Sequence, residues 1–384
     1  MARRPRLLIL SFSPIAQDAR VLKQVALFAG HTELTTCGFG PAPAGADHHL
    51  EITHRSLPGR SWDALLQLRA YRAGYWLLPD VRAAHRALRG RAFDAVLADD
   101  IDTLPLALSL GAGGGVHSDL HEYFPRLQEE HGPWRRRIGP WYTWLCRTHL
   151  PRAASVTTVG RAIAAEYTRQ FGVEVGVVTN ATPLADLHPT PVHDPVRVVH
   201  SGTSHRERNL MALVEGVLAV PGYTLDLFLT PTDPVHLAEL RARAEGEPRL
   251  TVHDPVAYED LVRTLNQFDL GVHLLPPRNF NFANALPNKI FDFAQARIGA
   301  IVGPSPEMAA VVRDNDFGEV APGYGSQDLA EVLARLTPGR IREMKHHADE
   351  HTVELSAGAQ VVGWDRAVGE LLERARGLDG AGRA

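Results

Sequence analysis

A stretch from His200 to Leu210, HSGTSHRERNL, carries residue types that suit an anion site. It follows an apolar run and leads into a helix expected from about Asn209. The N-terminus of such a helix offers free N–H groups, and Gly202 lets a ligand approach the backbone. Together with the positive charges of Arg206 and Arg208, the segment predicts phosphate binding.

The same stretch also has a purely structural interpretation. Ser204 and Glu207 match the S-x-x-E capping box, in which two side chains satisfy backbone N–H groups at the start of a helix. The two interpretations are compatible, so a capping box would not exclude phosphate binding.

A second candidate is NALPNKIFDFAQA, from Asn284 to Ala296. Pro287 suits the first turn of a helix, and Asn288 and Asp292, four residues apart, share one helical face with Lys289 beside it. An acid one turn inside the helix can accept both hydroxyls of a ribose, and a nearby lysine can neutralise a diphosphate. The alternative, which composition alone favours, is an ordinary amphipathic helix that exposes Lys289 and Asp292.

Titratable residues also follow predicted strands in the first half of the chain. Asp119, His121 and Glu122 come late in, or just after, a predicted strand that begins at Val116. His121 is the strongest candidate among them for a hydrogen bond to a reacting hydroxyl, although one histidine among 19 is more often structural.

Three further acids form the pattern Asp99-Asp100-x-Asp102, which resembles a metal-binding pair. They come directly after an apolar strand in the first half. This placement favours an acceptor-side or structural role over metal binding.

These candidates lie on an alternation of short apolar runs and helices, which is typical of a parallel sheet with helical crossovers. Strands are predicted at 7–12, 33–38, 95–98, 116–120, 156–159 and 175–179, and then at 196–200, 224–229, 249–253, 270–275 and 300–302. Helices are predicted from about residues 18, 209 and 234, and at 258–268 and 288–297. The expected fold class is α/β, with two βα domains.

The domain boundaries follow from the breaks in this pattern. Four prolines interrupt it between residues 181 and 195, so this stretch is the predicted linker. The N-terminal domain is expected over 1–180, and the C-terminal domain over 196–357. An apolar stripe predicts a last helix over 358–376, which in the architecture discussed below is expected to pack back on the N-terminal domain. A length of 384 residues suits two such domains.

Composition narrows the class of protein. With 45% hydrophobic and 22% charged residues the chain is expected to be globular, and a net charge of -4 gives no case for nucleic acid as a partner. Cys37 and Cys146 lack CxxC spacing, so neither disulfides nor a zinc site is indicated. Because the run Leu7 to Phe12 is short for a signal peptide and no run approaches the ~20 apolar residues of a spanning helix, the expected location is cytoplasmic.

The segment from Trp134 to Arg152 has three tryptophans and five arginines without an acid. This composition suits peripheral contact with the inner face of a membrane, or a lipid-phosphate acceptor. The residues expected to make that contact are Trp134, Arg135, Arg136, Arg137, Trp141 and Trp144. The alternative, which is favoured slightly, is a buried helix whose arginines lie on a solvated face.

Taken in order, these motifs resemble glycosyltransferase family 4 (glycosyl transferases group 1), whose members have two Rossmann-like domains in the GT-B arrangement. The matching segments are DARVLKQV, DLHEYFP, VTTVG, VVTNAT, HSGTSHRERNL, LPNKIFDFAQA and SPEMAAVV, and they span nearly the whole chain. The family motif E-x7-E has Asn284 at its first position here and Asp292 at its second. A subgroup with the PNK variant, Pro287 to Lys289, resembles this sequence more closely.

The resemblance implies a hexosyltransferase-like enzyme of polysaccharide biosynthesis that moves a sugar from a UDP- or GDP-sugar to a hydroxyl acceptor. It implies that Arg208 and Lys289 contact the donor diphosphate and that Asp292 holds the ribose. Since fixed cations can stabilise the departing diphosphate, no metal or other cofactor is expected. Retention of the anomeric configuration is favoured.

In the first half, the resemblance implies that His121, Asp119 and Glu122 have catalytic roles and point into the cleft between the domains. Asp18 and Arg20 are expected on the acceptor side of the same cleft.

Two other functions remain open. A nucleotide-sugar epimerase of the same architecture would release free nucleotide and an altered sugar without an acceptor. A catalytically silent nucleotide-sugar-binding protein is the other, because Asn284 lacks the charge of the family's first acid. A dehydrogenase is disfavoured, since the glycines from Gly111 to Gly115 precede a strand instead of following one.

Overall fold

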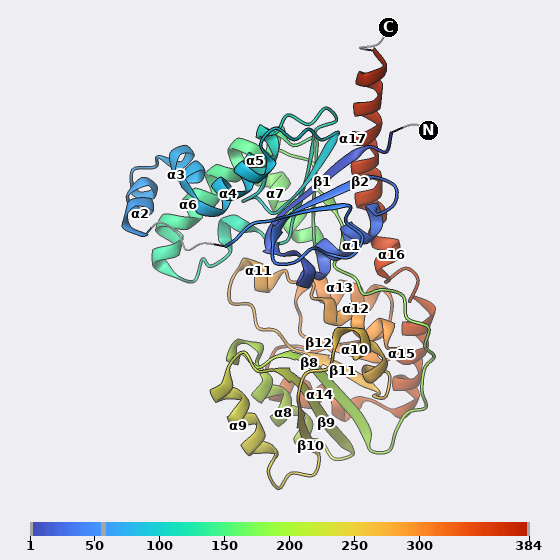
Figure 1. Cartoon of the computed structure of the whole chain (residues 1–384). Helices are drawn as coiled ribbons and strands as arrows, with labels where there is room; N and C mark the ends of the chain where they lie inside the picture. The colour runs from blue at the N-terminus through green and yellow to red at the C-terminus, as the bar shows by residue number, and fades with distance from the viewer. Residues whose placement is uncertain (1–2, 55–58, 382–384) are drawn as a thin grey trace. The chain divides into compact units, whose positions relative to one another are not determined.

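The structure is a computed structural model that describes residues 3–54 and 59–381. The chain forms two compact units (Figure 1). Unit 1 runs to Thr179 and also contains residues 279–281 and the chain from Val361 onward. Unit 2 contains Asn180–Arg278 and Phe282–Gln360.

Unit 1 is built on a seven-stranded sheet in the order β3-β2-β1-β4-β5-β6-β7, with parallel pairing throughout. Its strands are β1 Arg6–Pro14, β2 Glu33–Phe39, β3 His48–Glu51, β4 Ala95–Asp99, β5 Val116–Leu120, β6 Ser155–Thr158 and β7 Gly176–Val177. Its helices are α1 Ala19–Phe28, α2 Gly59–Gln67, α3 Tyr71–Leu77, α4 Pro79–Leu88, α5 Leu104–Ser109, α6 Gly132–His149, α7 Arg161–Phe171 and α17 Val362–Ala381. The central strands β4 and β5 are buried along their whole length, as expected when helices cover both faces of a parallel sheet.

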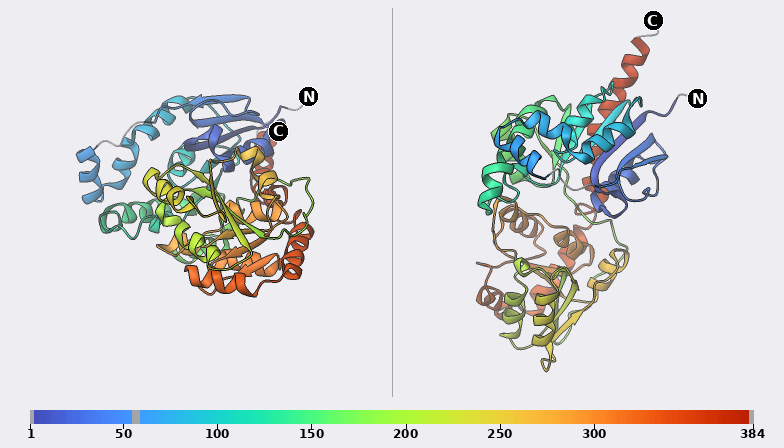
Figure 2. Two further views of the ribbon diagram at one scale, coloured as in Figure 1. Left: turned by 90° about the horizontal axis from the view of Figure 1, so that it is seen from below. Right: turned by 60° about the vertical axis from the view of Figure 1, so that its left-hand side comes forward.

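Helix α17 belongs to the core of unit 1 and runs along its sheet (Figures 1 and 2). Its apolar stripe, which includes Trp364 and Leu371, is buried together with Leu7 and Ile9 of β1. The backbone of Leu371 approaches Gly114 so closely that a Cβ there would lie 1.9 Å from the carbonyl oxygen. The last helix therefore completes the N-terminal core, and it continues past residue 376 to residue 381.

Unit 2 is built on a six-stranded parallel sheet in the order β10-β9-β8-β11-β12-β13. Its strands are β8 Val196–Thr203, β9 Tyr223–Thr230, β10 Leu250–His253, β11 Leu270–His273, β12 Gly299–Val302 and β13 Gly318–Val320. Its helices are α8 Leu210–Leu218, α9 Pro234–Ala244, α10 Tyr258–Leu265, α12 Asn288–Gln295, α13 Pro306–Asp314, α14 Ser326–Arg335, α15 Pro338–Glu350 and α16 Ala357–Gln360. The short helix α11, Phe280–Ala283, has its first two residues in unit 1 and its last two in unit 2.

The predicted fold class, two α/β domains with parallel sheets, is confirmed. Residues 181–195 form neither helix nor strand, and hydrogen bonds hold this segment to unit 2. Thr182 donates to Asp292, and Ala185 is bound through its backbone to the side chains of Gln295 and Arg297. Within the described ranges, no helix combines the length and the apolar character needed to span a membrane.

Candidate functional site

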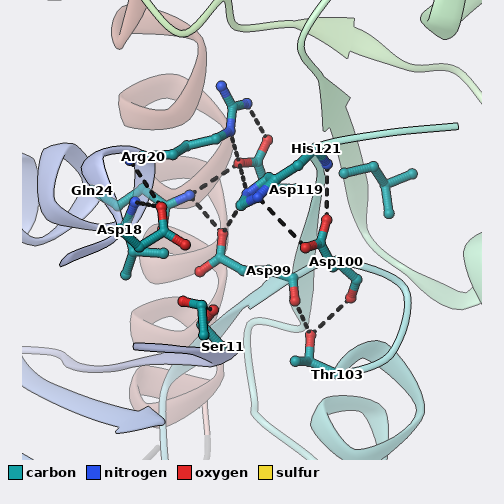
Figure 3. Close-up of polar contacts among 12 residues, drawn as sticks. Ser11, Asp18, Arg20, Gln24, Asp99, Asp100, Thr103, Asp119 and His121 are labelled. Carbon is teal, nitrogen blue, oxygen red and sulfur yellow. Dashed lines mark hydrogen bonds and ion pairs between the residues drawn. The ribbon is translucent and has the colours of Figure 1, made fainter. Parts of the chain in front are cut away.

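A buried ion pair lies at the carboxyl end of β5 (Figure 3). Arg20 donates Nε to Oδ2 of Asp119 and Nη2 to Oδ1, both at 2.7 Å. Gln24 and Thr157 donate to the same carboxylate at 3.0 and 2.7 Å. Burial by itself would raise the pKa of Asp119, but the adjacent Arg20 holds it below its ordinary value. Asp119 is thus a fully buried, permanently charged group whose oxygens are already bound.

The start of α1 aims Arg20 at this carboxylate. Asp18 caps the helix by accepting hydrogen bonds from the backbone N–H groups of Arg20 and Val21 at 3.0 and 3.3 Å. Arg20 also donates to the carbonyl oxygen of Val178 at 2.8 Å, and its guanidinium lies 4.6 Å from the ring centroid of Trp364. The structure therefore engages Asp18 and Arg20 inside unit 1, where Arg20 positions Asp119.

His121 is the partly exposed member of this cluster. Its backbone N–H donates to Oδ1 of Asp100 at 2.9 Å, and its ring nitrogens lie 3.5 to 3.6 Å from the carboxylates of Asp99, Asp100 and Asp119. Burial would lower its pKa, but these carboxylates, Asp100 foremost, raise the pKa of His121 well above the usual value. With 21% of its side chain exposed, His121 can present a protonated ring to a substrate.

Asp100 is held in an unusual backbone conformation beside this ring. Its φ is 66°, in the left-handed region that residues other than glycine seldom adopt. Its N–H donates to the carbonyl oxygen of Asp119 at 2.7 Å, and Thr103 Oγ1 donates to the Asp100 carbonyl at 2.9 Å. Such strain is frequent at functional sites, and here it holds a carboxylate against His121.

Asp99, Asp119 and His121 offer three potential metal-ligand atoms within 4.8 Å of one another. Both oxygens of Asp119 are already occupied by the Arg20 guanidinium, whose positive charge would repel a cation. This cluster therefore suits a protonated histidine better than a divalent ion. Glu122 lies outside this set of three, and its carbonyl oxygen accepts a hydrogen bond from Tyr167 at 2.7 Å.

Unit 2 has a pocket of about 390 Å³ where β8 ends and α12 begins. The residues that line it are Ser201, Gly202, Arg208, Phe228, Thr230, Pro255, Val256, Tyr258, Leu261, Pro287, Asn288, Lys289 and Asp292. The two predicted segments, 200–210 and 284–296, are thereby brought to one pocket.

Two cations, Lys289 and Arg208, line this pocket. Within the described part of the chain, neither Lys289 nor Arg208 has an ion pair, and Arg208 instead lies 5.7 Å from the ring centroid of Phe282. Burial, followed by the charge of Arg208, lowers the pKa of Lys289 to about 8. A Cβ at Gly202 would lie 2.9 Å from Cε and 3.0 Å from Nζ of Lys289, so this glycine makes room for the ammonium group.

Two neutral histidines lie near the ammonium group of Lys289. Burial, and next the charge of Lys289, lowers the pKa of His200 to about 3 and that of His273 well below its usual value. The rings stack at 5.7 Å, and His200 Nδ1 donates to the carbonyl oxygen of Val272 at 2.8 Å. Because His200 is neutral and donates through Nδ1, its Nε2 carries a lone pair on the side of Gly202 and Lys289.

The remainder of the pocket has an acid and an apolar wall. Asp292 is almost fully buried, lines the pocket and accepts a hydrogen bond from Thr182. Phe228, Tyr258 and Leu261 lie on the wall, and Phe228 is stacked on His253 with a centroid distance of 4.4 Å. The pocket thus joins positive charge, one hydroxyl-accepting carboxylate and a flat apolar surface.

The structure separates Arg206 from this pocket. Its guanidinium forms an ion pair with Glu239 on the surface, while Arg208, two residues further along the same 3-10 turn, lines the pocket. Asn284 lies between α11 and α12 and is not among the lining residues. Of the predicted donor-binding residues, the pocket collects Gly202, Arg208, Asn288, Lys289 and Asp292.

The predicted capping box is wrong. Ser204 Oγ exchanges hydrogen bonds with the backbone of Asp233, at 3.2 and 2.9 Å, and Glu207 pairs with Arg278. The segment forms a 3-10 turn over residues 206–208, and Asn209 follows with a left-handed φ of 60°. Contacts with segments distant in the chain therefore replace the local hydrogen bonds that the sequence pattern predicted.

Sequence reasoning missed several members of both clusters. Gln24, Thr157 and Thr182 have common polar side chains without a motif, and His200 and His273 lie inside apolar strands. The histidines did carry a signal, because a polar side chain that follows buried apolar residues of a strand needs a hydrogen-bond partner.

No protein-family model matches the chain, and no curated protein matches it significantly. Solved structures do. Anabaena HepE in complex with UDP is 14% identical, with a TM-score of 0.69 over 95% of this chain and 99% of that chain. Sucrose-phosphate synthase from Thermosynechococcus elongatus is 14% identical, with a TM-score of 0.71 over 96% and 100% of the two chains. The trehalose 6-phosphate synthase of Burkholderia multivorans is 12% identical, with a TM-score of 0.66 over 100% and 99%. The chain shares the GT-B fold of these glycosyltransferases.

Proposed function

We propose that the chain is a glycosyltransferase that takes a sugar from a nucleotide-sugar donor bound in the unit 2 pocket. The observation that carries this proposal is the pair Lys289 and Arg208, two cations that line the pocket without an ion-pair partner among the described residues. A diphosphate supplies the missing charge. Asp292 then accepts the ribose hydroxyls, and the wall of Phe228 and Tyr258 packs against the base.

The same pair provides the chemistry of bond cleavage. As the glycosidic bond to the diphosphate breaks, negative charge grows on the leaving oxygen, and fixed cations stabilise it without rearranging. Transfer with retention and without a metal ion fits this arrangement. A UDP-sugar is the preferred donor in this proposal, because structures with the same fold were solved with UDP and UDP-glucose.

In unit 1, His121 is proposed to donate a hydrogen bond from its protonated ring to a substrate hydroxyl. Asp119 acts through His121 and Arg20 and is a positioning residue, because it is completely buried. Of the residues expected to contact a membrane, Arg135, Arg136 and Arg137 are exposed and Trp134 and Trp144 are half-buried, whereas Trp141 is buried in the core.

The test uses two arginines separated by one residue. Removing Arg208, as Arg208→Ala, should weaken UDP binding by about 10- to 150-fold, the effect of losing a charge-assisted hydrogen bond of roughly 1.5 to 3 kcal/mol. Arg206→Ala is the matched control and should leave UDP binding unchanged, since Arg206 pairs with Glu239. Equal losses in both variants, or none in either, would refute the phosphate assignment.

A product assay then separates the proposed activity from its alternatives. A glycosyltransferase hydrolyses the UDP-sugar slowly without acceptor and releases UDP and the free sugar. An epimerase releases an altered sugar, and a silent binding protein is stabilised by UDP yet releases neither product.

A further inference from the structure

Unit 1 contains a second pocket, of about 290 Å³, between α3, α5 and α6. It includes Ser109 at the end of α5 and Thr148 in the last turn of α6, just before the chain enters β5 and β6. His121 follows the opposite, carboxyl end of β5. None of Asp99, Asp100, Asp119 and His121 is among the residues that line this pocket. The pocket is therefore not part of the His121 cluster.

The charge of this pocket is unbalanced. Arg72 and Arg152 line it, and across the described residues neither guanidinium has a hydrogen bond or an ion pair. No aspartate or glutamate is among the lining residues. Buried His149 lies with them, and burial, together with the charges of Arg152 and Arg72, lowers its pKa. Both arginines thus act on the same small volume.

The walls of the pocket are aromatic and fixed in place. The hydroxyl of Tyr75 donates to the carbonyl oxygen of Asp102 at 2.8 Å, which holds the neighbouring Trp76 edge-on at 5.3 Å. Trp144 lies edge-on to His149 at the same distance. His149 Nδ1 donates to the carbonyl oxygen of Leu145 at 3.0 Å, which leaves Nε2 for a ligand.

We propose that this pocket is a second ligand site, separate from the reaction site, which binds a phosphate monoester carried on an apolar group. Arg72 and Arg152 bind the phosphate, and the apolar group packs against Trp76 and Trp144. Two guanidiniums suit phosphate because each can donate two parallel hydrogen bonds to its oxygens. The phosphate can come from a soluble ester or from the headgroup of a lipid.

Phenyl phosphate is the probe, with the full-length protein. Trp76 and Trp144 lie in the pocket, so saturable binding should change tryptophan fluorescence, and calorimetry should give the same dissociation constant. Phenol, which lacks the phosphate, should bind at least tenfold more weakly. Equal binding of phenol would overturn the phosphate assignment.

Variants then locate the site. Arg72→Ala with Arg152→Ala should weaken phenyl phosphate binding by about 100-fold, or roughly tenfold for each lost charge-assisted contact. Arg135→Ala with Arg147→Ala removes two exposed arginines of α6 that do not line the pocket, and should change binding less than about twofold. Both double variants should keep the thermal stabilisation by UDP, which shows that they fold. Similar losses in the two double variants, or no saturable binding at all, would overturn the proposal.

Sedimentation with lipid vesicles identifies the source of the phosphate. Wild-type protein and both double variants are sedimented with phosphatidic acid vesicles and with phosphatidylcholine vesicles. Binding to phosphatidic acid that Arg72→Ala with Arg152→Ala abolishes, and the control pair keeps, assigns a lipid headgroup. Binding of phenyl phosphate without any vesicle binding assigns a soluble ester.

Discussion

Both units gather charged side chains at the carboxyl ends of their strands, but the charges are balanced in one and unbalanced in the other. In unit 1, Arg20 and Asp119 saturate each other, with Gln24 and Thr157 completing the carboxylate. In unit 2, Lys289 and Arg208 face the pocket without an ion-pair partner among the described residues. The complete network stabilises unit 1. The buried cations of unit 2 lower its stability while the pocket is empty, but they leave a site for an anionic ligand.

The largest effect is expected from breaking the complete network. Asp119→Ala leaves the Arg20 guanidinium buried without its partner, which should lower the free energy of unfolding of unit 1 by about 3 to 5 kcal/mol. All six tryptophans lie in unit 1, so urea unfolding followed by tryptophan fluorescence reports this unit alone. Arg169→Ala, which removes an exposed pair with Glu166, should shift the transition little. A loss below about 1 kcal/mol for Asp119→Ala would contradict the structural role.

Removing a charge from the pocket of unit 2 is expected to have the opposite effect on stability. Lys289→Met removes a charge that the unliganded protein desolvates without a partner, so unit 2 should keep or gain stability while UDP affinity falls roughly 10- to 150-fold. Amide hydrogen exchange in β8 and α12 measures the stability, and calorimetry measures the affinity. A destabilised unit 2 with undiminished UDP affinity would make Lys289 a structural residue.

The pH dependence of stability sharpens the same contrast. Burial and Arg208 depress the pKa of Lys289 in the folded state from 10.5 to about 8, so between these values the unfolded chain holds the proton and the folded chain does not. Stability of unit 2 should therefore rise from pH 8 to 10.5, by about 1.4 kcal/mol for each pKa unit of depression. In Lys289→Met this rise should disappear from hydrogen exchange measured across the same range. A rise of the same size in both proteins would assign it to another group.

The smallest effect is expected at Gly202. A Cβ there would displace the end of the Lys289 side chain, which is flexible, so Gly202→Ala should weaken UDP binding by a modest factor, about fivefold or roughly 1 kcal/mol. In the Lys289→Met variant, Gly202→Ala should reduce UDP affinity little further, because the ammonium group that the new Cβ would displace is absent. Additive losses across this double-mutant cycle would show that Gly202 acts on the ligand independently of Lys289.

The sequence predicts many of the strands because short runs rich in apolar residues alternate with helical patterns. Strands β4, β5 and β9 lie within one residue of the predicted ranges at each end. The edge strand β3 and helices α2 to α4 were not located, since short and partly exposed elements lack such a run. The exchange of residues 279–281 into unit 1, through two hydrogen bonds between Asn281 and the backbone of Tyr123, has no local signal.

The site was predictable only where a motif was local. Lys289 and Asp292 lie on one helix, and their spacing indicates a shared function. Arg206 and Arg208 look equivalent in sequence, and only the position of Glu239 on α9 separates them. Likewise Asp119 looked catalytic, but Arg20, 99 residues away in the chain, buries it as a positioning residue.

The central claim is that Lys289 and Arg208 bind the diphosphate of the donor. The most direct test is to measure proton uptake when the protein binds UDP. Calorimetric titration at pH 8, in buffers of different ionisation enthalpy, counts the protons taken up. Since about half of the Lys289 side chains are neutral at this pH, a bound diphosphate should draw roughly half a proton per site, and Lys289→Met should abolish this uptake. Binding without uptake, or uptake that persists in Lys289→Met, would contradict the account.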